Sequence, residues 1–264
     1  MEIIGYIASA LIGISLGLIG GGGSILTIPV LVYLLGVNAI DATAYSLFIV
    51  GVTALVGAYP KYRQGLVNVK TAIIFGIPSI IAVFISRKLL VPAIPSTLFS
   101  IGSLVITKSI LMMLLFAVLM VFAAVSMIKN QKVASTQTET KQKHYNPLIL
   151  LEGVKVGILT GLVGAGGGFL IIPALVIFTG LPMKVAVGTS LLIIASNSLI
   201  GFIGDFGHFQ MNWSILFSVT GIAIIGIFIG NYLSLKIDGA KLKKGFGWFI
   251  LIMGIYIIVK ELFL

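Results

Sequence analysis

Hydrophobic residues in this chain gather in ten runs, and most polar residues lie in the short stretches between them. Eight or more runs approach the roughly 20 residues that a helix needs to cross a bilayer. The pattern predicts an all-α polytopic membrane protein. The runs cover residues 3–19, 25–35, 42–59, 69–85, 110–128, 148–163, 169–178, 185–203, 215–235 and 248–259.

A glycine-rich stretch occurs twice in the chain, 144 positions apart. Gly17 to Pro29 reads GLIGGGGSILTIP, and Gly161 to Pro173 reads GLVGAGGGFLIIP. Glycine-interrupted apolar segments at corresponding places of two halves are typical of secondary transporters and point to the substrate site. We interpret residues 1–128 and 147–264 as two membrane repeats, joined by a polar cytoplasmic linker at 129–146.

The second run of each half has about a dozen residues, or roughly 18 Å of helix, against a hydrocarbon core of about 30 Å. We therefore expect a hairpin in which a longer helix breaks at the glycines and returns as a shorter helix to the side it came from. Lipid cannot satisfy open backbone groups, so such breaks must be buried in protein or line a watery cavity. The two breaks are expected to meet near mid-membrane. Residues 87–108, with two prolines, are expected to form an ordered loop or a short interfacial helix.

The basic residues favour an inverted repeat of about five helical segments in each half. With five segments per half the second copy is upside down, and 13 of the 17 Lys and Arg residues lie on one side. Four crossings per half would make the copies parallel and give a split of nine to eight. The positive-inside rule selects the first arrangement and makes its basic side cytoplasmic. Residues 3–19 lack a basic segment and a cleavage site, so we interpret them as a retained first helix.

The glycine breaks are the first candidate site for a ligand. Glycine lets the backbone leave helical geometry and brings amides close to a ligand. Amides at a half-helix N-terminus also favour an anion. Close helix packing is the alternative, which we expect for glycines at four-residue spacing such as Gly13/Gly17, Gly153/Gly157/Gly161 and Gly226/Gly230. Pro29 and Pro173 could begin the returning helices or kink them. The candidates in the breaks are Gly20, Gly21, Gly22, Gly23, Ser24, Gly164, Ala165, Gly166, Gly167 and Gly168.

The second set of candidates is polar and lies in the second run after each break, at 42–59 and 185–203. Its hydroxyls and amide could contact substrate, or could bond across helices and back to their own backbone. These residues are Ser46, Thr53, Thr189, Ser190 and Asn197.

Other chemistry finds little support in the sequence. The ionisable residues Asp41, Lys184, Asp205 and His208 lie near segment ends, where solvation or snorkelling is expected. Glu152 and Lys155 should pair on a helix. With no cysteine, no central carboxylate cluster and no phosphate-loop motif, we expect no catalytic site, metal, cofactor or nucleic-acid partner.

The two glycine stretches and the segment from Ala186 to Gly201, AVGTSLLIIASNSLIG, resemble the TauE/SafE family of sulfite exporters and organosulfur anion permeases. The resemblance covers nearly the whole chain. It implies a multi-pass carrier of small anions in the inner cell membrane, commonly of sulfite, sulfonates or related anions. We therefore expect a secondary transporter that works by alternating access. An anion channel and a carrier of a non-sulfur carboxylate are the alternatives, and the oligomeric state and coupling to a proton or another ion stay open.

Overall fold

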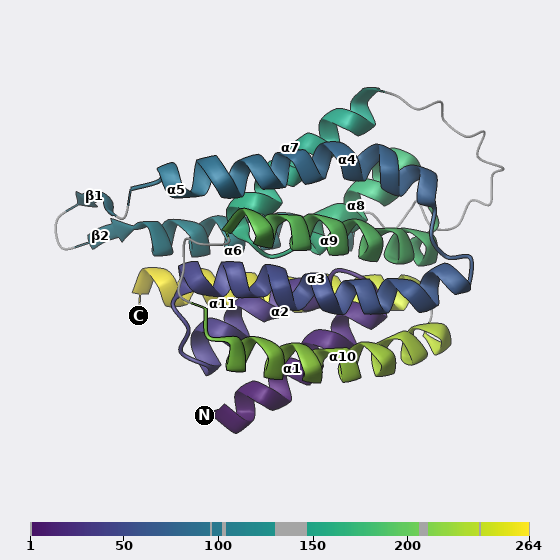
Figure 1. Ribbon diagram of the computed structural model, residues 1–264, viewed down its shortest axis with the longest axis horizontal. Helices are drawn as coiled ribbons and strands as arrows, with labels where there is room; N and C mark the ends of the chain where they lie inside the picture. The colour runs from purple at the N-terminus through teal and green to yellow at the C-terminus, as the bar shows by residue number, and fades with distance from the viewer. Residues whose placement is uncertain are drawn as a thin grey trace.

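The molecule is a bundle of helices that lie side by side along its longest axis (Figure 1). The computed structural model describes residues 2–95, 97–101, 104–129, 147–205, 211–237 and 239–263. Among them, five helical segments are long and apolar enough to cross a membrane, fewer than the eight or more expected. Those five segments are Ala39–Arg63, Val69–Ala93, Lys108–Val125, Met183–Asp205 and Trp213–Lys236.

The helices follow the hydrophobic runs closely in both halves. The first half holds α1 (Glu2–Ile19), α2 (Gly22–Pro29) with a π-helical extension η1 (Val30–Leu34), α3 (Ala39–Arg63), α4 (Val69–Ile85), η2 (Ser86–Leu90), α5 (Val91–Ala93), β1 (Thr97–Ile101), β2 (Leu104–Thr107) and α6 (Lys108–Lys129). The second holds α7 (Pro147–Val163), α8 (Gly168–Thr179), α9 (Met183–Asp205), α10 (Trp213–Lys236) and α11 (Gly239–Phe263).

Residues at equivalent positions of the two halves begin and end equivalent helices. Asn68 and Asn212 cap α4 and α10, each accepting a hydrogen bond from the third backbone N–H that follows it. Gly36 and Gly180 follow η1 and α8 with φ of +68° each, a left-handed conformation that glycine adopts without steric cost. The sequence repeat therefore also includes the residues that begin and end the helices.

Helix α2 runs back along α1, as the short second run predicts. A β-carbon on Gly5 of α1 would lie 2.5 Å from Leu35, just past η1, and one on Gly23 would overlap the carbonyl of Ile12. Pro29 and Pro173 lie inside their helices, so neither begins a returning helix.

The glycines at four-residue spacing pack helices together, as predicted. A β-carbon on Gly17 of α1 would lie 2.5 Å from the carbonyl of Ile227 of α10, and one on Gly226 would overlap the carbonyl of Ala10. Gly153, Gly157 and Gly161 bring α7 against α4 in the same way. Small residues allow this close backbone approach between membrane helices. The first helix of each half therefore packs against the fourth helix of the other half.

The third helices of the two halves, α3 and α9, cross at the centre in opposite directions. Gly51 faces Leu199, while Leu47, four residues earlier on α3, faces Gly201 further along α9. Apolar residues of both helices fill the core between them, including Leu47, Val50, Leu191 and Ile194, each with no exposed surface.

The segment after α4, expected to be an ordered loop or a short interfacial helix, contains a helical extension and a β-hairpin, so the chain is not purely helical. Residues 86–93 continue α4 as η2 and α5, and β1 and β2 then form an antiparallel hairpin. Residues 130–146 of the predicted linker lie outside the described residues, as does His208.

Candidate functional site

The two glycine breaks meet inside the bundle. A β-carbon on Gly21 would lie 2.5 Å from the carbonyl of Gly168, and one on Gly168 would lie 2.5 Å from Cα of Gly21. All ten predicted break residues are buried. Two segments almost 150 positions apart in sequence are thus brought into backbone contact.

The first break is shorter than predicted. Gly20 alone has a left-handed backbone there, with φ of +78°, and Gly22, Gly23 and Ser24 already form the first turn of α2. The hydroxyl of Ser24 donates to the carbonyl of Gly21 at 2.7 Å. The hydroxyl of Ser24 is therefore already bonded within its own segment.

The second break is more irregular. Gly164, Gly166 and Gly167 have φ of +73°, +65° and +69°, a region that residues with a β-carbon rarely adopt. Ala165 lies between them, and Gly168 begins α8. Because three residues leave helical geometry, this break is the better candidate for backbone contact with a ligand.

Each break rests on the third helix of the opposite half, at equivalent positions. A β-carbon on Gly20 would lie 2.8 Å from the carbonyl of Val187, and one on Gly164 would lie 2.9 Å from the carbonyl of Thr43. Thr43 and Val187 are 144 positions apart, the same offset as the breaks.

Buried polar side chains surround the second break. A β-carbon on Gly166 would lie 2.8 Å from Oγ of Ser198, and one on Gly167 would overlap Oγ1 of Thr160. Both hydroxyls are buried and have no hydrogen-bond partner among the described residues. The same is true of the hydroxyl of Ser86, which faces Gly161. Buried polar atoms are normally satisfied in folded proteins, so unmatched ones around one break indicate a place for water or a polar ligand.

The five polar candidates on α3 and α9 are all buried, but they differ in their bonds. Ser46 and Thr53 have no partner among the described residues. Asn197 donates to Ser79 at 2.7 Å and keeps its amide oxygen unbonded. By contrast, Thr189 accepts from the backbone N–H of Asn68 at 2.9 Å, and Ser190 donates to the carbonyl of Val187 at 2.8 Å. The first three therefore keep bonding capacity for a ligand.

An arginine expected in an ordered loop or a short interfacial helix is buried beside the second break. Arg87 of η2 has no exposed surface, and its Nη2 lies where a β-carbon of Gly164 would project. Its Nη1 donates to Oγ1 of Thr43 at 3.0 Å and lies 3.2 Å from Oδ2 of Asp205. Asp205 is 2% exposed, so the expectation that this carboxylate is solvated at a helix end was wrong. The apolar residues Leu89, Leu90 and Val91 extend the run past Arg87 and could have indicated its burial.

A second buried cation lies near the first break. Lys61 is 4% exposed, and its Nζ donates to Oγ of Ser234 at 2.6 Å. Lys61, Lys184 and Val187 line a narrow cavity of about 20 Å³, enough for a single water molecule. Val187 also touches Gly20, so this basic cavity adjoins the first break. Glu152 and Lys155 pair at 2.9 Å, as predicted.

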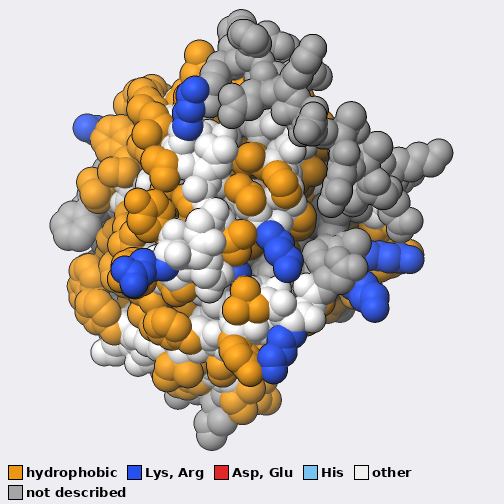
Figure 2. Space-filling view, turned by 90° about the vertical axis from the view of Figure 1, so that its right-hand side faces the viewer, with side chains coloured by type: hydrophobic (Ala, Val, Ile, Leu, Met, Phe, Trp, Pro, Cys, Tyr) orange, Lys and Arg blue, Asp and Glu red, His pale blue; other side chains and the backbone are white. Residues whose placement is uncertain are grey.

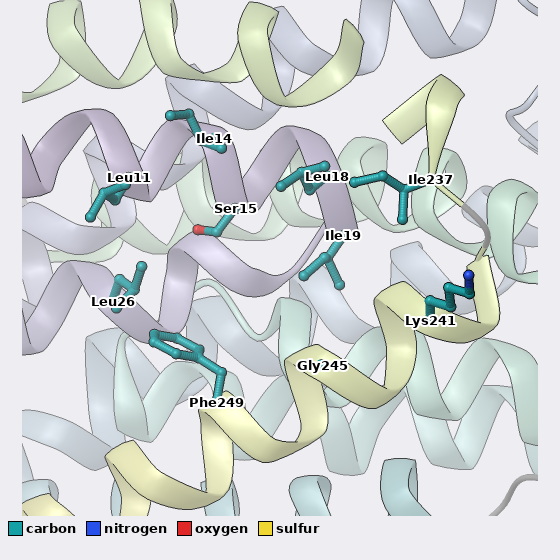
Figure 3. Close-up of a pocket in the computed structure, with 10 residues that line it drawn as sticks. All are labelled: Leu11, Ile14, Ser15, Leu18, Ile19, Leu26, Ile237, Lys241, Gly245 and Phe249. Atoms are coloured by element: carbon teal, nitrogen blue, oxygen red, sulfur yellow. The ribbon is translucent and has the colours of Figure 1, made fainter. Parts of the chain in front are cut away.

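A larger cavity of about 400 Å³ lies between α1, α2 and α11 (Figure 3). Its walls are almost entirely apolar, with Lys241 at one end, and the hydroxyl of Ser15 already donates to the carbonyl of Ile12. It offers little to a small anion. No group of three or more His, Asp or Glu residues that could hold a metal ion occurs among the described residues.

Comparison with known proteins identifies the family. Residues 6–257 match the family described as "Sulfite exporter TauE/SafE". The chain belongs to the TauE/SafE family. A probable membrane transporter protein from Xylella fastidiosa (strain Temecula1) is 32% identical over 95% of this chain and 92% of its own length. The probable membrane transporter protein YdhB from Bacillus subtilis (strain 168) is 29% identical over 83% of this chain and 85% of its own. No solved structure matches.

Membership in the TauE/SafE family agrees with a multi-pass membrane protein that functions in transport. The family match spans both glycine breaks and the polar residues of α3 and α9. The breaks and the buried side chains around them therefore lie within the matched region.

Proposed function

We propose that this TauE/SafE protein is a secondary transporter of small anions, most of all of sulfite, a sulfonate or a related sulfur oxyanion. Substrate binds at the second glycine break, where the two breaks meet, and alternating access carries it across the membrane. The family description names sulfite export, which supports the choice of substrate class.

The observation that carries the proposal is the contact of the two breaks amid buried, unmatched polar groups. Gly21 touches Gly168, and the donors Ser198 and Thr160 face the second break. Irregular backbone and hydroxyl donors suit a small oxyanion, because each oxygen can accept several hydrogen bonds. The proposed binding residues are those of the second break, with Ser46, Thr53 and Asn197 completing the site.

An inverted repeat is part of the proposal, since it provides two halves that can rock against each other around a central site. Its support is the antiparallel crossing of α3 and α9, which are equivalent helices. In Figure 1, α4 and α10 also run in opposite directions along the molecule. Halves of the same orientation would keep equivalent helices parallel.

The basic residues support a cytoplasmic position for one end of the bundle. Lys61 and Lys184 line one cavity near the end where α3 meets α4 and α10 meets α11. Figure 2 views this end and shows several Lys and Arg side chains, with no Asp or Glu among the coloured atoms. Under the positive-inside rule this end faces the cytoplasm, and the inner cell membrane is the proposed location.

Transport by purified protein in liposomes tests the proposal. The panel is sulfite, thiosulfate, sulfoacetate, taurine and acetate, each inside the vesicle with a radiolabelled or dye-detected anion outside. We expect saturable uptake of at least one sulfur oxyanion, accelerated by the same unlabelled anion on the opposite side. Uptake without saturation or counterflow would indicate a channel, and preference for acetate over every sulfur anion would contradict the substrate class.

A further inference from the structure

We propose that Arg87 supplies the positive charge that binds the transported anion at the second break, through its Nε and Nη2 groups. This inference rests on the proposed function and adds to it the residue that selects for an oxyanion.

The bonds of Arg87 divide its guanidinium into an occupied edge and an open edge. Thr43 and Asp205 both contact Nη1. Nε and Nη2 are buried and have no hydrogen-bond partner among the described residues. In a guanidinium, the N–H of Nε and one N–H of Nη2 point the same way, a fork that matches two oxygens of an oxyanion.

The open edge adjoins the backbone of the second break. Nη2 lies against Gly164, where any side chain would overlap it, and Gly164 has a left-handed φ of +73°. Burying a charged group with two unmatched nitrogens is costly, and proteins normally supply partners. An anion bound at the break would supply them.

Asp205 and Thr43 hold the guanidinium in place. The carboxylate of Asp205 balances the charge of Arg87 when no anion is bound, and Thr43 fixes the orientation of Nη1. Because Asp205 also competes with an anion for the same positive charge, the affinity of the site depends on that carboxylate.

Arg87 breaks the equivalence of the two halves. The position 144 residues later is Asn231, whose amide donates to the carbonyl of Gly57 at 3.3 Å. The equivalent of Asp205 is Lys61, which bonds Ser234. The first break therefore has no guanidinium in the corresponding place, and the inference assigns one anion to the second break.

Binding measurements on purified protein in detergent test this role. The probe is the anion of the panel above that wild type binds most tightly, titrated by calorimetry. Chloride, an anion of a single atom, is titrated for comparison because it cannot contact both N–H groups through two oxygens. The variants are Arg87→Gln and Arg87→Lys, and the control is Arg63→Gln, because Arg63 is exposed and is the chain's other arginine. We expect about tenfold or more loss of affinity for Arg87→Gln, as for a lost charge-assisted hydrogen bond.

Arg87→Lys keeps the charge but lacks the fork, so it should bind the oxyanion more weakly than wild type and discriminate less against chloride. Arg63→Gln should bind as wild type does. Wild-type affinity in a folded Arg87→Gln protein would overturn the inference and leave the proposed function standing. If wild type bound no anion of the panel, the proposed function itself would fail.

Two further variants decide the matter if the Arg87 variants do not fold. Asp205→Asn removes the competing carboxylate, so the anion should bind several-fold more tightly, although the protein should be less stable. Thr43→Val loosens the guanidinium and should weaken binding several-fold. An ion pair with a merely structural role predicts lower stability and unchanged affinity in both variants, and that result would overturn the inference.

Discussion

Gly21 and Gly168 touch through their backbones, so that a β-carbon on either residue would fall 2.5 Å from the other. They belong to the two glycine breaks, one from each half of the chain. The adjacent glycines that the sequence suggested for ligand contact thus also serve close packing, at the point where the halves meet. Close packing and ligand contact thus apply to different residues of the breaks. Gly168 packs against the other break, whereas Gly166 faces Ser198.

Alanine at Gly168 or Gly21 should force the two breaks apart. We expect a loss of stability of about 1–3 kcal/mol from overpacking, together with loss of transport. Thermal unfolding in detergent and liposome uptake measure the two effects. Gly245→Ala on α11 is the control, because a β-carbon there meets nothing within 4 Å. Full uptake by Gly168→Ala would show that the breaks need not touch.

Two glycines of α10 should respond to alanine in opposite ways. Gly226 packs against the carbonyl of Ala10, so Gly226→Ala should separate α1 from α10 and lower stability by about 1–3 kcal/mol. Gly221 has open space around its Cα, so Gly221→Ala should be neutral or stabilising by up to about 1 kcal/mol. Unfolding midpoints of the two variants test this. Equal midpoints would contradict the packing role.

Ser46→Ala should weaken anion binding without lowering the stability of the protein. The hydroxyl of Ser46 is buried and has no partner among the described residues, so its removal should leave stability unchanged or slightly higher. If Ser46 contacts the anion, binding should weaken by about 1 kcal/mol, or roughly fivefold. Ser190→Ala is the comparison, because it loses the bond to Val187 and should cost stability. Unchanged affinity in Ser46→Ala would place this serine outside the site.

Cysteine labelling should locate the two halves relative to the membrane. Lys70 and Ser214 are exposed, equivalent positions at the starts of α4 and α10, and the chain has no cysteine of its own. Single cysteines at these two sites should react with a membrane-impermeant thiol reagent from opposite sides. Labelling of both from the same side would contradict the inverted repeat.

The helices and the packing role of the spaced glycines can be predicted from the sequence alone. The runs of apolar residues predict where most helices lie, because a bilayer demands a certain length of apolar helix whatever its neighbours are. Glycines four residues apart, such as Gly226 and Gly230, predict a close helix contact because the spacing places both on one face. The repeat at 144 positions likewise locates both breaks in the sequence.

The identity of the polar residues buried around the breaks depends on tertiary contacts that the sequence pattern does not contain. Asp205 was expected to be a solvated or snorkelling charge near a segment end, and Arg87 to lie in a loop or short interfacial helix, since nothing local distinguishes a solvated end from a buried one. Their burial comes from η2, α3 and α9, whose residues Arg87, Thr43 and Asp205 are far apart in sequence and meet beside Gly164. Burial of a charge depends on what distant segments bring to it, because the cost of removing water is offset only by partners in three dimensions.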